Sequence, residues 1–212
     1  MTACTESSTV TSPQIESTKQ PTPQISLVMH EDAVSAHHRF SPVSFRGAVW
    51  DLSHLDAFAL KVEIADGLSV DVVILFECHC FSTDIEKDPR GASSVPPDEL
   101  YRNSRETRVL NEERYLLSQL VLRQVIQSLP DRPIRIARDN YVTLEIVGID
   151  GKKMNYAVFF AVEKDGKRRK RLLLRVQSAY PLAAVSHRIA NGQKVRFAQL
   201  IKKTYLGQPL RG

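Results

Sequence analysis

The sequence has little of what membrane-spanning, secreted or disulfide-bonded proteins need. No stretch approaches the roughly 18 consecutive apolar residues of a membrane-spanning helix, because the longest apolar run is only Tyr156 to Val162. The N-terminus lacks the basic start and apolar core of a secretory signal. The three cysteines, Cys4, Cys78 and Cys80, are an odd number that cannot make the disulfide framework of a secreted domain. These absences predict a cytoplasmic protein with reduced thiols.

Two motifs are also missing, and each absence excludes a class of protein. The chain contains no Gly-x-Ser-x-Gly string, which a serine hydrolase with a nucleophile elbow would show. It also contains no glycine-rich phosphate loop of the kind that nucleotide-binding proteins carry. With 42% hydrophobic and 25% charged residues, the composition is that of an ordinary globular domain and excludes collagen-like, coiled-coil and wholly disordered chains.

The organisation of the chain follows from where large apolar residues begin. Residues 1–24 are rich in Ser, Thr, Pro and Gln, a composition that cannot bury enough surface to offset the entropy of ordering it. We therefore predict a disordered tail over 1–24 and a single domain over 25–212. A division of that domain into a β-rich part over 25–100 and a basic part over 101–212 stays open.

The clearest local pattern predicts a β-hairpin. Apolar residues alternate from Phe58 to Ile64, the turn dipeptide Asp66-Gly67 follows, and alternation resumes at Val70. Extra apolar residues in the second run indicate a strand that is covered on both faces. The alternation continues through Glu77-Cys78-His79-Cys80, which predicts that the two cysteines share one face of the strand.

The second half of the chain predicts a helix and more strands. A helix capped near Asn111 should bury a stripe that includes Leu116 and Leu120, after a long loop over 83–100. Asp-Gly turns at 150–151 and 165–166 then separate three alternating runs, the pattern of an antiparallel meander. The expected fold is thus α+β, with an antiparallel hairpin and a three-stranded antiparallel meander packed with one main helix.

Charge is distributed very unevenly along the chain. Residues 1–80 hold 4 Lys and Arg against 10 Asp and Glu, whereas residues 151–212 hold 15 against 2, a net charge of +13. Such an excess is typical of a surface that meets phosphates, although a solvated basic face without a partner gives the same count. The candidate nucleic-acid-binding residues are the cations of one turn and two tyrosines that could stack on bases, namely Lys167, Arg168, Arg169, Lys170, Arg171, Tyr141 and Tyr156.

The string Glu77-Cys78-His79-Cys80 is the most unusual local feature. We expect no metal there, because zinc sites commonly combine two ligand pairs and the chain offers no second pair. His79 is a candidate general acid or base, or a hydrogen-bonded structural histidine. A two-carboxylate nuclease is a further alternative, with its acids drawn from Asp71, Glu77, Asp84 and Glu145.

The layout of residues 110–205 resembles the RelE-like messenger-RNA-cleaving toxins of bacteria. The resemblance rests on Asn140-Tyr141, the strand from Tyr156 to Val162 and Ser178-Ala179-Tyr180. It implies an endoribonuclease that needs neither metal nor cofactor, inhibits growth and pairs with a small acidic protein partner.

Two hypotheses follow from these observations. The first is a metal-independent ribonuclease, in which Arg175 stabilises the charged transition state and Tyr180 or His79 moves the proton. The second is a non-catalytic module that binds nucleic acid or a protein partner through the basic C-terminal surface. The sequence does not separate the two.

Overall fold

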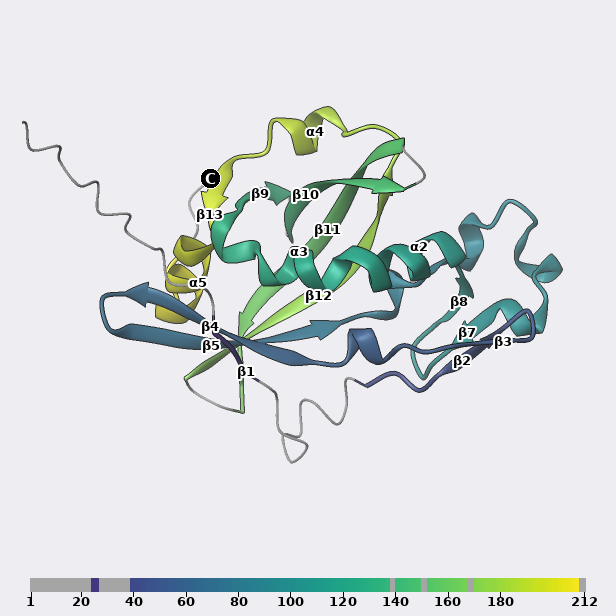
Figure 1. Cartoon of the computed structure of the whole chain (residues 1–212), viewed down its shortest axis with the longest axis horizontal. Helices are drawn as coiled ribbons and strands as arrows, with labels where there is room; N and C mark the ends of the chain where they lie inside the picture. The colour runs from purple at the N-terminus through teal and green to yellow at the C-terminus, as the bar shows by residue number, and fades with distance from the viewer. Residues whose placement is uncertain (1–23, 27–38, 138–139, 150–151, 168–169, 210–212) are drawn as a thin grey trace, which may run out of the picture.

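The computed structural model shows a curled β-sheet with one long helix across one face and small elements at either end (Figure 1). The predicted disordered tail lies outside the described residues except for Gln24. The residues that the structure describes are 24–26, 39–137, 140–149, 152–167 and 170–209.

The predicted hairpin is formed by β4 (Phe58–Ala65) and β5 (Leu68–Phe76). Gly67 has φ +70, a left-handed conformation that glycine adopts without the steric cost of a Cβ atom. Val72 to Phe76 are all buried, so β5 is covered on both faces. A strand of this kind belongs in the interior of a sheet.

The predicted meander is formed by β10 (Asn140–Ile149), β11 (Lys152–Lys164) and β12 (Arg171–Leu182). It is not a separate antiparallel unit, because β12 pairs with β5 in parallel, with Leu172 opposite Val72. The prediction of a hairpin and a meander packed with one helix is therefore wrong. Both belong to one mixed sheet, in the order β1-β4-β5-β12-β11-β10-β9-β13.

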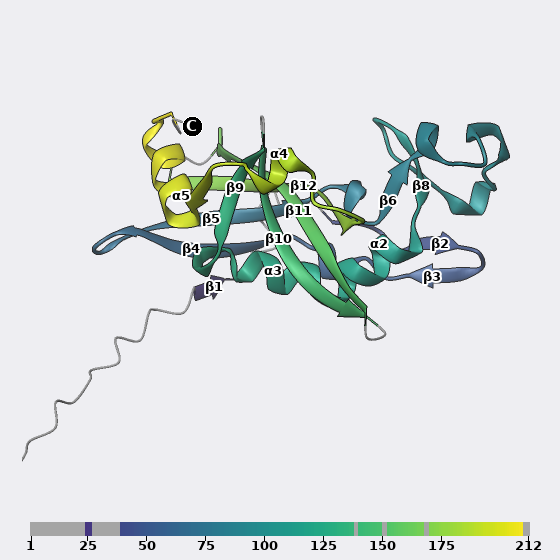
Figure 2. The same cartoon turned by 90° about the horizontal axis from the view of Figure 1, so that it is seen from above.

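Three short strands complete this sheet at its two edges. They are β1 (Gln24–Ser26), β9 (Pro133–Ala137) and β13 (Lys194–Arg196). The sheet is strongly curled, so that β9, β10 and β11 cross steeply over the direction of β4 and β5 (Figure 2). Curling lets one sheet enclose much of the core, which includes Phe58, Ile74, Tyr156 and Val158 in a single cluster.

The helix begins at the expected cap, where the Asn111 side chain accepts a hydrogen bond from the Arg114 amide. It runs through α2 (Glu112–Leu117), a π-helical turn (Ser118–Leu122) and α3 (Arg123–Gln127). Leu116 and Leu120 are 52% and 56% exposed, so the prediction that they join the core is wrong. The π-helical turn changes the angular spacing of the side chains, and the buried apolar residues of the helix include Leu117, Leu122, Val125 and Ile126.

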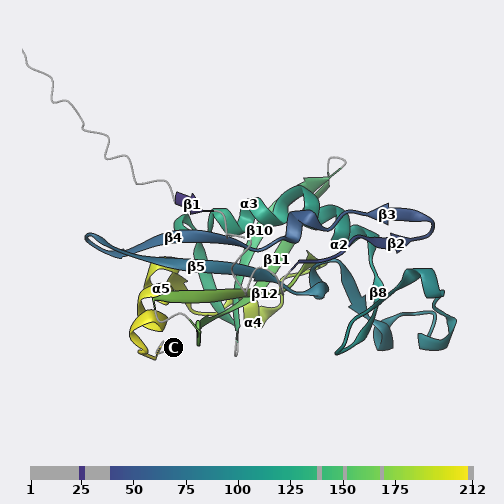
Figure 3. The ribbon, with the colours of Figure 1, turned by 90° about the horizontal axis from the view of Figure 1, so that it is seen from below.

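The two ends of the molecule carry different small elements (Figure 3). α4 (His187–Ala190) lies near the middle of the molecule, and one end has α5 (Phe197–Leu206). The other has two small sheets, formed by β2 (Val43–Phe45) with β3 (Ala48–Trp50), and by β6 (Ser82–Asp84), β8 (Thr107–Leu110) and β7 (Leu100–Arg102).

The segment predicted as a long loop, residues 83–100, is built mainly from short elements. After β6, three 3₁₀ turns follow at Ile85–Lys87, Ala92–Ser94 and Pro97–Glu99. Within the described parts of the chain, no helix is both long enough and apolar enough to cross a membrane.

Candidate functional site

The chain does not continue as a strand after β5 but forms a 3₁₀ turn, η2 (Cys78–Cys80). The Cys80 amide donates to the Glu77 carbonyl at 3.1 Å, and the Phe81 amide to the Cys78 carbonyl at 3.1 Å. The prediction that Cys78 and Cys80 share one strand face is therefore wrong. Cys80 is completely buried, whereas Cys78 and His79 turn towards one carboxylate that lies 27 or more residues further along the chain.

That carboxylate belongs to Glu106, in the turn between β7 and β8. The Asn103 side-chain oxygen accepts the amide N–H groups of Arg105 at 2.8 Å and of Glu106 at 2.9 Å, which fixes the turn. Glu106 Oε1 then lies 3.1 Å from His79 Nε2 and 3.3 Å from Cys78 Sγ. One ligand atom from each of the three residues lies within 4.8 Å of the others, and we call this group the Cys-His-Glu cluster.

The charge of Glu106 is stabilised by its neighbours. Burial opposes ionisation, but hydrogen bonds from Arg108, Cys78 and His79 outweigh it and lower the pKa of Glu106. Arg108 donates from Nη1 to Glu106 Oε2 at 2.9 Å. Burial, followed by the hydrogen bond to Glu106, raises the pKa of the Cys78 thiol to about 12. Without a metal, Cys78 is therefore a protonated donor and not a thiolate nucleophile.

A pocket of about 480 Å³ lies beside the cluster. Its lining includes His79, Arg108, Arg114 and Tyr180. Arg114 donates from Nη1 to the carbonyl of His79 at 3.0 Å, and its guanidinium lies 4.5 Å from the centre of the Tyr180 ring. The pocket therefore combines an imidazole, a phenol and two guanidinium groups.

The structure brings together two of the three predicted catalytic residues. His79 and Tyr180 line the same pocket, whereas Arg175 does not. The Arg175 guanidinium instead lies 2.9 Å from Glu77 Oε1 and 3.3 Å from Glu163 Oε1. Sequence reasoning missed Glu106, Arg108 and Arg114, which reach this pocket or the cluster from distant segments.

The residues of the predicted phosphate-binding turn differ in exposure and in pairing. Lys167 and Lys170 are exposed, as expected of binding residues. Arg171 is not, because it is buried and its guanidinium lies 2.7 Å (Nε) and 2.5 Å (Nη2) from Asp165 Oδ2. Arg168 and Arg169 lie outside the described residues.

The two tyrosines predicted to stack on bases are core residues. Tyr156 is completely buried, and its hydroxyl has no hydrogen-bond partner among the described residues. Tyr141 is half-buried and packs against Phe160, with ring centres 5.8 Å apart. The prediction of an exposed aromatic surface is wrong, because the strands that carry these residues face the core.

The predicted phosphate-binding turn and the pocket that contains Tyr180 lie near opposite ends of one strand. Arg171 begins β12 and Tyr180 lies near its end, nine residues on. At roughly 3.3 Å per residue, the turn and the pocket are about 30 Å apart.

Three of the four acids of the two-carboxylate alternative pair with separate cations. Glu77 pairs with Arg175, and Asp84 lies 3.9 Å from the Lys87 ammonium group. Glu145 pairs with Arg132. Among the described residues, the one group suited to a metal contains none of these four acids.

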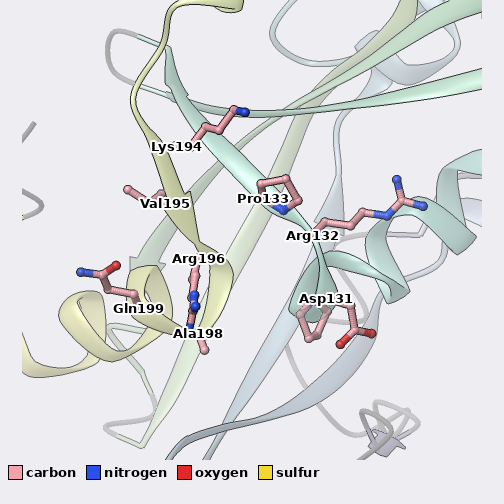
Figure 4. A pocket seen from close by; sticks show the side chains of 9 residues that line it. Asp131, Arg132, Pro133, Lys194, Val195, Arg196, Ala198 and Gln199 are labelled. Carbon is pink, nitrogen blue, oxygen red and sulfur yellow. The ribbon is translucent and has the colours of Figure 1, made fainter. Parts of the chain in front are cut away.

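A second pocket, of about 640 Å³, lies between β9 and the start of α5 (Figure 4). Arg132, Lys194 and Arg196 line it together with Asp131. Lys194 and Arg196 are exposed and form no ion pair within the described residues.

Further cations extend from this pocket along α5 to the turn before β12. The Lys164 side chain lies against Gly207, which ends α5, so the helix connects the pocket with that turn. Both acids of residues 151–212, Glu163 and Asp165, pair with arginines. We call the resulting set of cations the basic band: Lys164, Lys167, Lys170, Lys194, Arg196, Lys202 and Lys203.

The fold and the two sites define a curled mixed β-sheet protein with a Cys-His-Glu cluster at one end and a basic band at the other. Residues 42–205 match the model of the YjaZ family, and the chain belongs to that family. It is 28% identical to Protein YjaZ of Escherichia coli (strain K12) over 172 residues, which are 77% of this chain and 90% of that protein. No solved structure matches the chain significantly. Both sites lie inside the matched segment.

Proposed function

We propose that this protein binds single-stranded nucleic acid, RNA in particular, through the basic band. The observation that carries the proposal is that its seven cations have no ion-pair partners among the described residues. An unpaired cation that contacts a phosphate releases condensed counterions, which favours binding. A cation already paired with a carboxylate has less to gain.

The shape of the band supports an extended ligand. The ten residues of α5 alone span about 15 Å, with cations at the pocket before the helix and at the turn beside its end. The pocket of Figure 4 is lined by no aromatic side chain. Base stacking there contributes nothing, so we expect binding with little preference for sequence.

A cytoplasmic location, where single-stranded RNA is abundant, belongs to this proposal. Cell fractionation with an antibody against the full chain tests it. Recovery of the protein outside the cytoplasmic fraction would remove this part of the proposal.

A charge-matched pair of variants tests RNA binding. In one variant Arg196, Lys202 and Lys203 are replaced by Gln; in the other, Lys61, Arg102 and Lys153, three exposed cations outside the band, are replaced. Binding of a fluorescent oligouridine is measured by anisotropy at several salt concentrations. We expect the first variant to flatten the log-log salt slope by about 2, at about 0.7 per phosphate contact.

The control variant should keep the slope of the unmodified protein. If both variants flatten the salt slope equally, the net charge of the protein matters and the position of the cations does not, which contradicts the proposal. If an acidic protein binds the band and RNA does not, the ligand class is wrong although the surface is right.

RNA cleavage is a second candidate function, favoured by the presence of His79 and Tyr180 in one pocket. With Glu106 orienting the imidazole, His79 could move a proton, which is worth about 10² to 10⁴ in rate. Incubation of labelled RNA with protein in EDTA tests this, with His79→Gln as the inactive variant. If the RNA stays intact, cleavage is excluded and RNA binding remains the proposed function. Unimpaired growth of cells after induction of the protein would exclude a toxin.

A further inference from the structure

We propose that Cys78, His79 and Glu106 bind a zinc ion. This site lies at the opposite end of the molecule from the basic band and does not depend on RNA binding. Thiolate sulfur, imidazole nitrogen and carboxylate oxygen are the three ligand types that proteins offer to zinc. The Cys-His-Glu cluster supplies one of each.

The spacing of the three side chains fits one ion. Zinc lies about 2.0 to 2.3 Å from such ligands, so neighbouring ligands of a tetrahedral ion are about 3.3 to 3.8 Å apart. Here Glu106 Oε1 lies 3.1 Å from His79 Nε2 and 3.3 Å from Cys78 Sγ. The third pair, Cys78 Sγ and His79 Nε2, lies within 4.8 Å.

The ligands are held in place by their own surroundings. The hydrogen bonds of η2 fix Cys78 and His79, and the Asn103 side chain fixes the turn that carries Glu106. Arg108 occupies Glu106 Oε2, which leaves Oε1 for the ion. Asn103 Nδ2 also lies 3.7 Å from Cys78 Sγ, where it can donate to a thiolate. Such supporting contacts are typical of metal sites.

Three protein ligands leave the fourth position of a tetrahedral ion open. Cys78 is buried, whereas the His79 side chain is 38% exposed and lines the pocket of about 480 Å³. The open position therefore lies on the pocket side, where Arg114 and Tyr180 form part of the wall. Structural zinc sites fill all four positions with protein ligands, so this arrangement is that of an accessible site.

Cys80 takes no part in the proposed site. Its thiol is completely buried and faces the Val176 carbonyl at 4.0 Å. The sequence-based expectation of no zinc rested on the absence of a second cysteine or histidine pair. It did not include Glu106, which comes from a separate hairpin.

Metal content and cobalt substitution test the proposal on the full-length protein. Elemental analysis should find one zinc per chain after dialysis, and replacement by Co²⁺ should give a thiolate-to-cobalt charge-transfer band. Cys78→Ser should abolish that band, and His79→Gln and Glu106→Gln should each weaken zinc binding at least about tenfold. The matched controls Cys4→Ser, His187→Gln and Glu112→Gln should bind zinc as the unmodified protein does.

Circular dichroism establishes which variants fold. Glu106 lies in a partly exposed turn, so Glu106→Gln keeps the test decisive if Cys78→Ser does not fold. Absence of zinc from the unmodified protein, or an unchanged cobalt spectrum in folded Cys78→Ser, would overturn the proposal. His79 and Glu106 would then form a metal-free acid-base pair. RNA binding through the basic band is measured separately and is expected to survive EDTA.

Discussion

The two ends of this molecule use charge in opposite ways. At the end that holds α5, the basic band consists of cations without ion-pair partners among the described residues. At the other end, Arg46 and Arg90 pair with Glu99, and Arg108 pairs with Glu106. We call the second region the paired end.

The comparison separates charges that fix structure from charges that remain available to a ligand. A buried or half-buried pair loses much of its hydration, and each member then depends on the other. An exposed lysine keeps its hydration and exchanges only counterions when a ligand arrives. Net charge alone, which is +13 over residues 151–212, does not distinguish the two kinds.

Among the cations of residues 151–212, Arg171 should have the largest effect on stability. Arg171→Gln removes the ion pair that Arg171 forms with the buried Asp165, so we expect the free energy of unfolding to fall by about 3 kcal/mol. The adjacent Lys170→Gln should change it by less than about 0.5 kcal/mol. Urea unfolding of both variants measures the difference. Equal stabilities would show that Arg171 belongs with the exposed cations.

Tyr156 should give a smaller effect of opposite sign. Its hydroxyl is buried and unpartnered among the described residues, and burial raises its pKa. Tyr156→Phe removes that polar group, so we expect a gain of about 1 kcal/mol in the free energy of unfolding. RNA affinity should not change. A fall in RNA affinity, with stability unchanged, would show that Tyr156 contacts RNA, as the sequence predicts.

Glu99 should make the paired end sensitive to acid. Hydrogen bonds from Arg46 and Arg90 lower the pKa of Glu99, so its contribution to stability is present above the ordinary glutamate pKa. That contribution is lost as the pH falls through the lower pKa of the folded state. Glu99→Gln should lower Tm near pH 6 by an amount equivalent to less than about 1 kcal/mol. The difference from the unmodified protein should vanish once the pH is below the lowered pKa of Glu99 in the folded state; a constant difference would contradict this.

Lys202 and Lys203 should have the smallest effect on stability. Neither forms an ion pair within the described residues, so the double Gln variant should unfold within about 0.5 kcal/mol of the unmodified protein. The same variant should flatten the RNA salt slope by about 1.4. A large loss of stability would mean that these side chains support α5 and are not reserved for a ligand.

The sequence predicts local structure well where one segment decides it. The Asp66-Gly67 turn and the Asn111 cap are formed by neighbouring residues, and the structure has both. The stripe along the helix was only partly predictable. Leu116 and Leu120 are exposed, and the π-helical turn over 118–122 changes which of the following side chains face the core.

Features formed by segments that are distant in the sequence could not be predicted from it. The extra apolar residues between the alternating ones indicate that β5 is buried on both faces, but any apolar strand could have filled the place that β12 takes. His79 was identified as a candidate from its unusual neighbours. Glu106 was not, because nothing in the local sequence indicates that the turn after β7 reaches η2. One signal was present in Asn103, since Asn commonly fixes a turn.

The parallel pairing of β5 and β12 affects when the Cys-His-Glu cluster can form during synthesis. Asp71 stands opposite Arg171, so the pair joins residues 100 positions apart, and the Glu77 amide donates to the Val176 carbonyl at 3.0 Å. Long-range pairing of this kind is slow, and nascent chains emerge from the ribosome N-terminus first. A chain released before β12 would contain all three residues of the cluster but lack the strand against which η2 is anchored. All three residues of the cluster are thus synthesised well before the strand that anchors η2 is available to hold them in place.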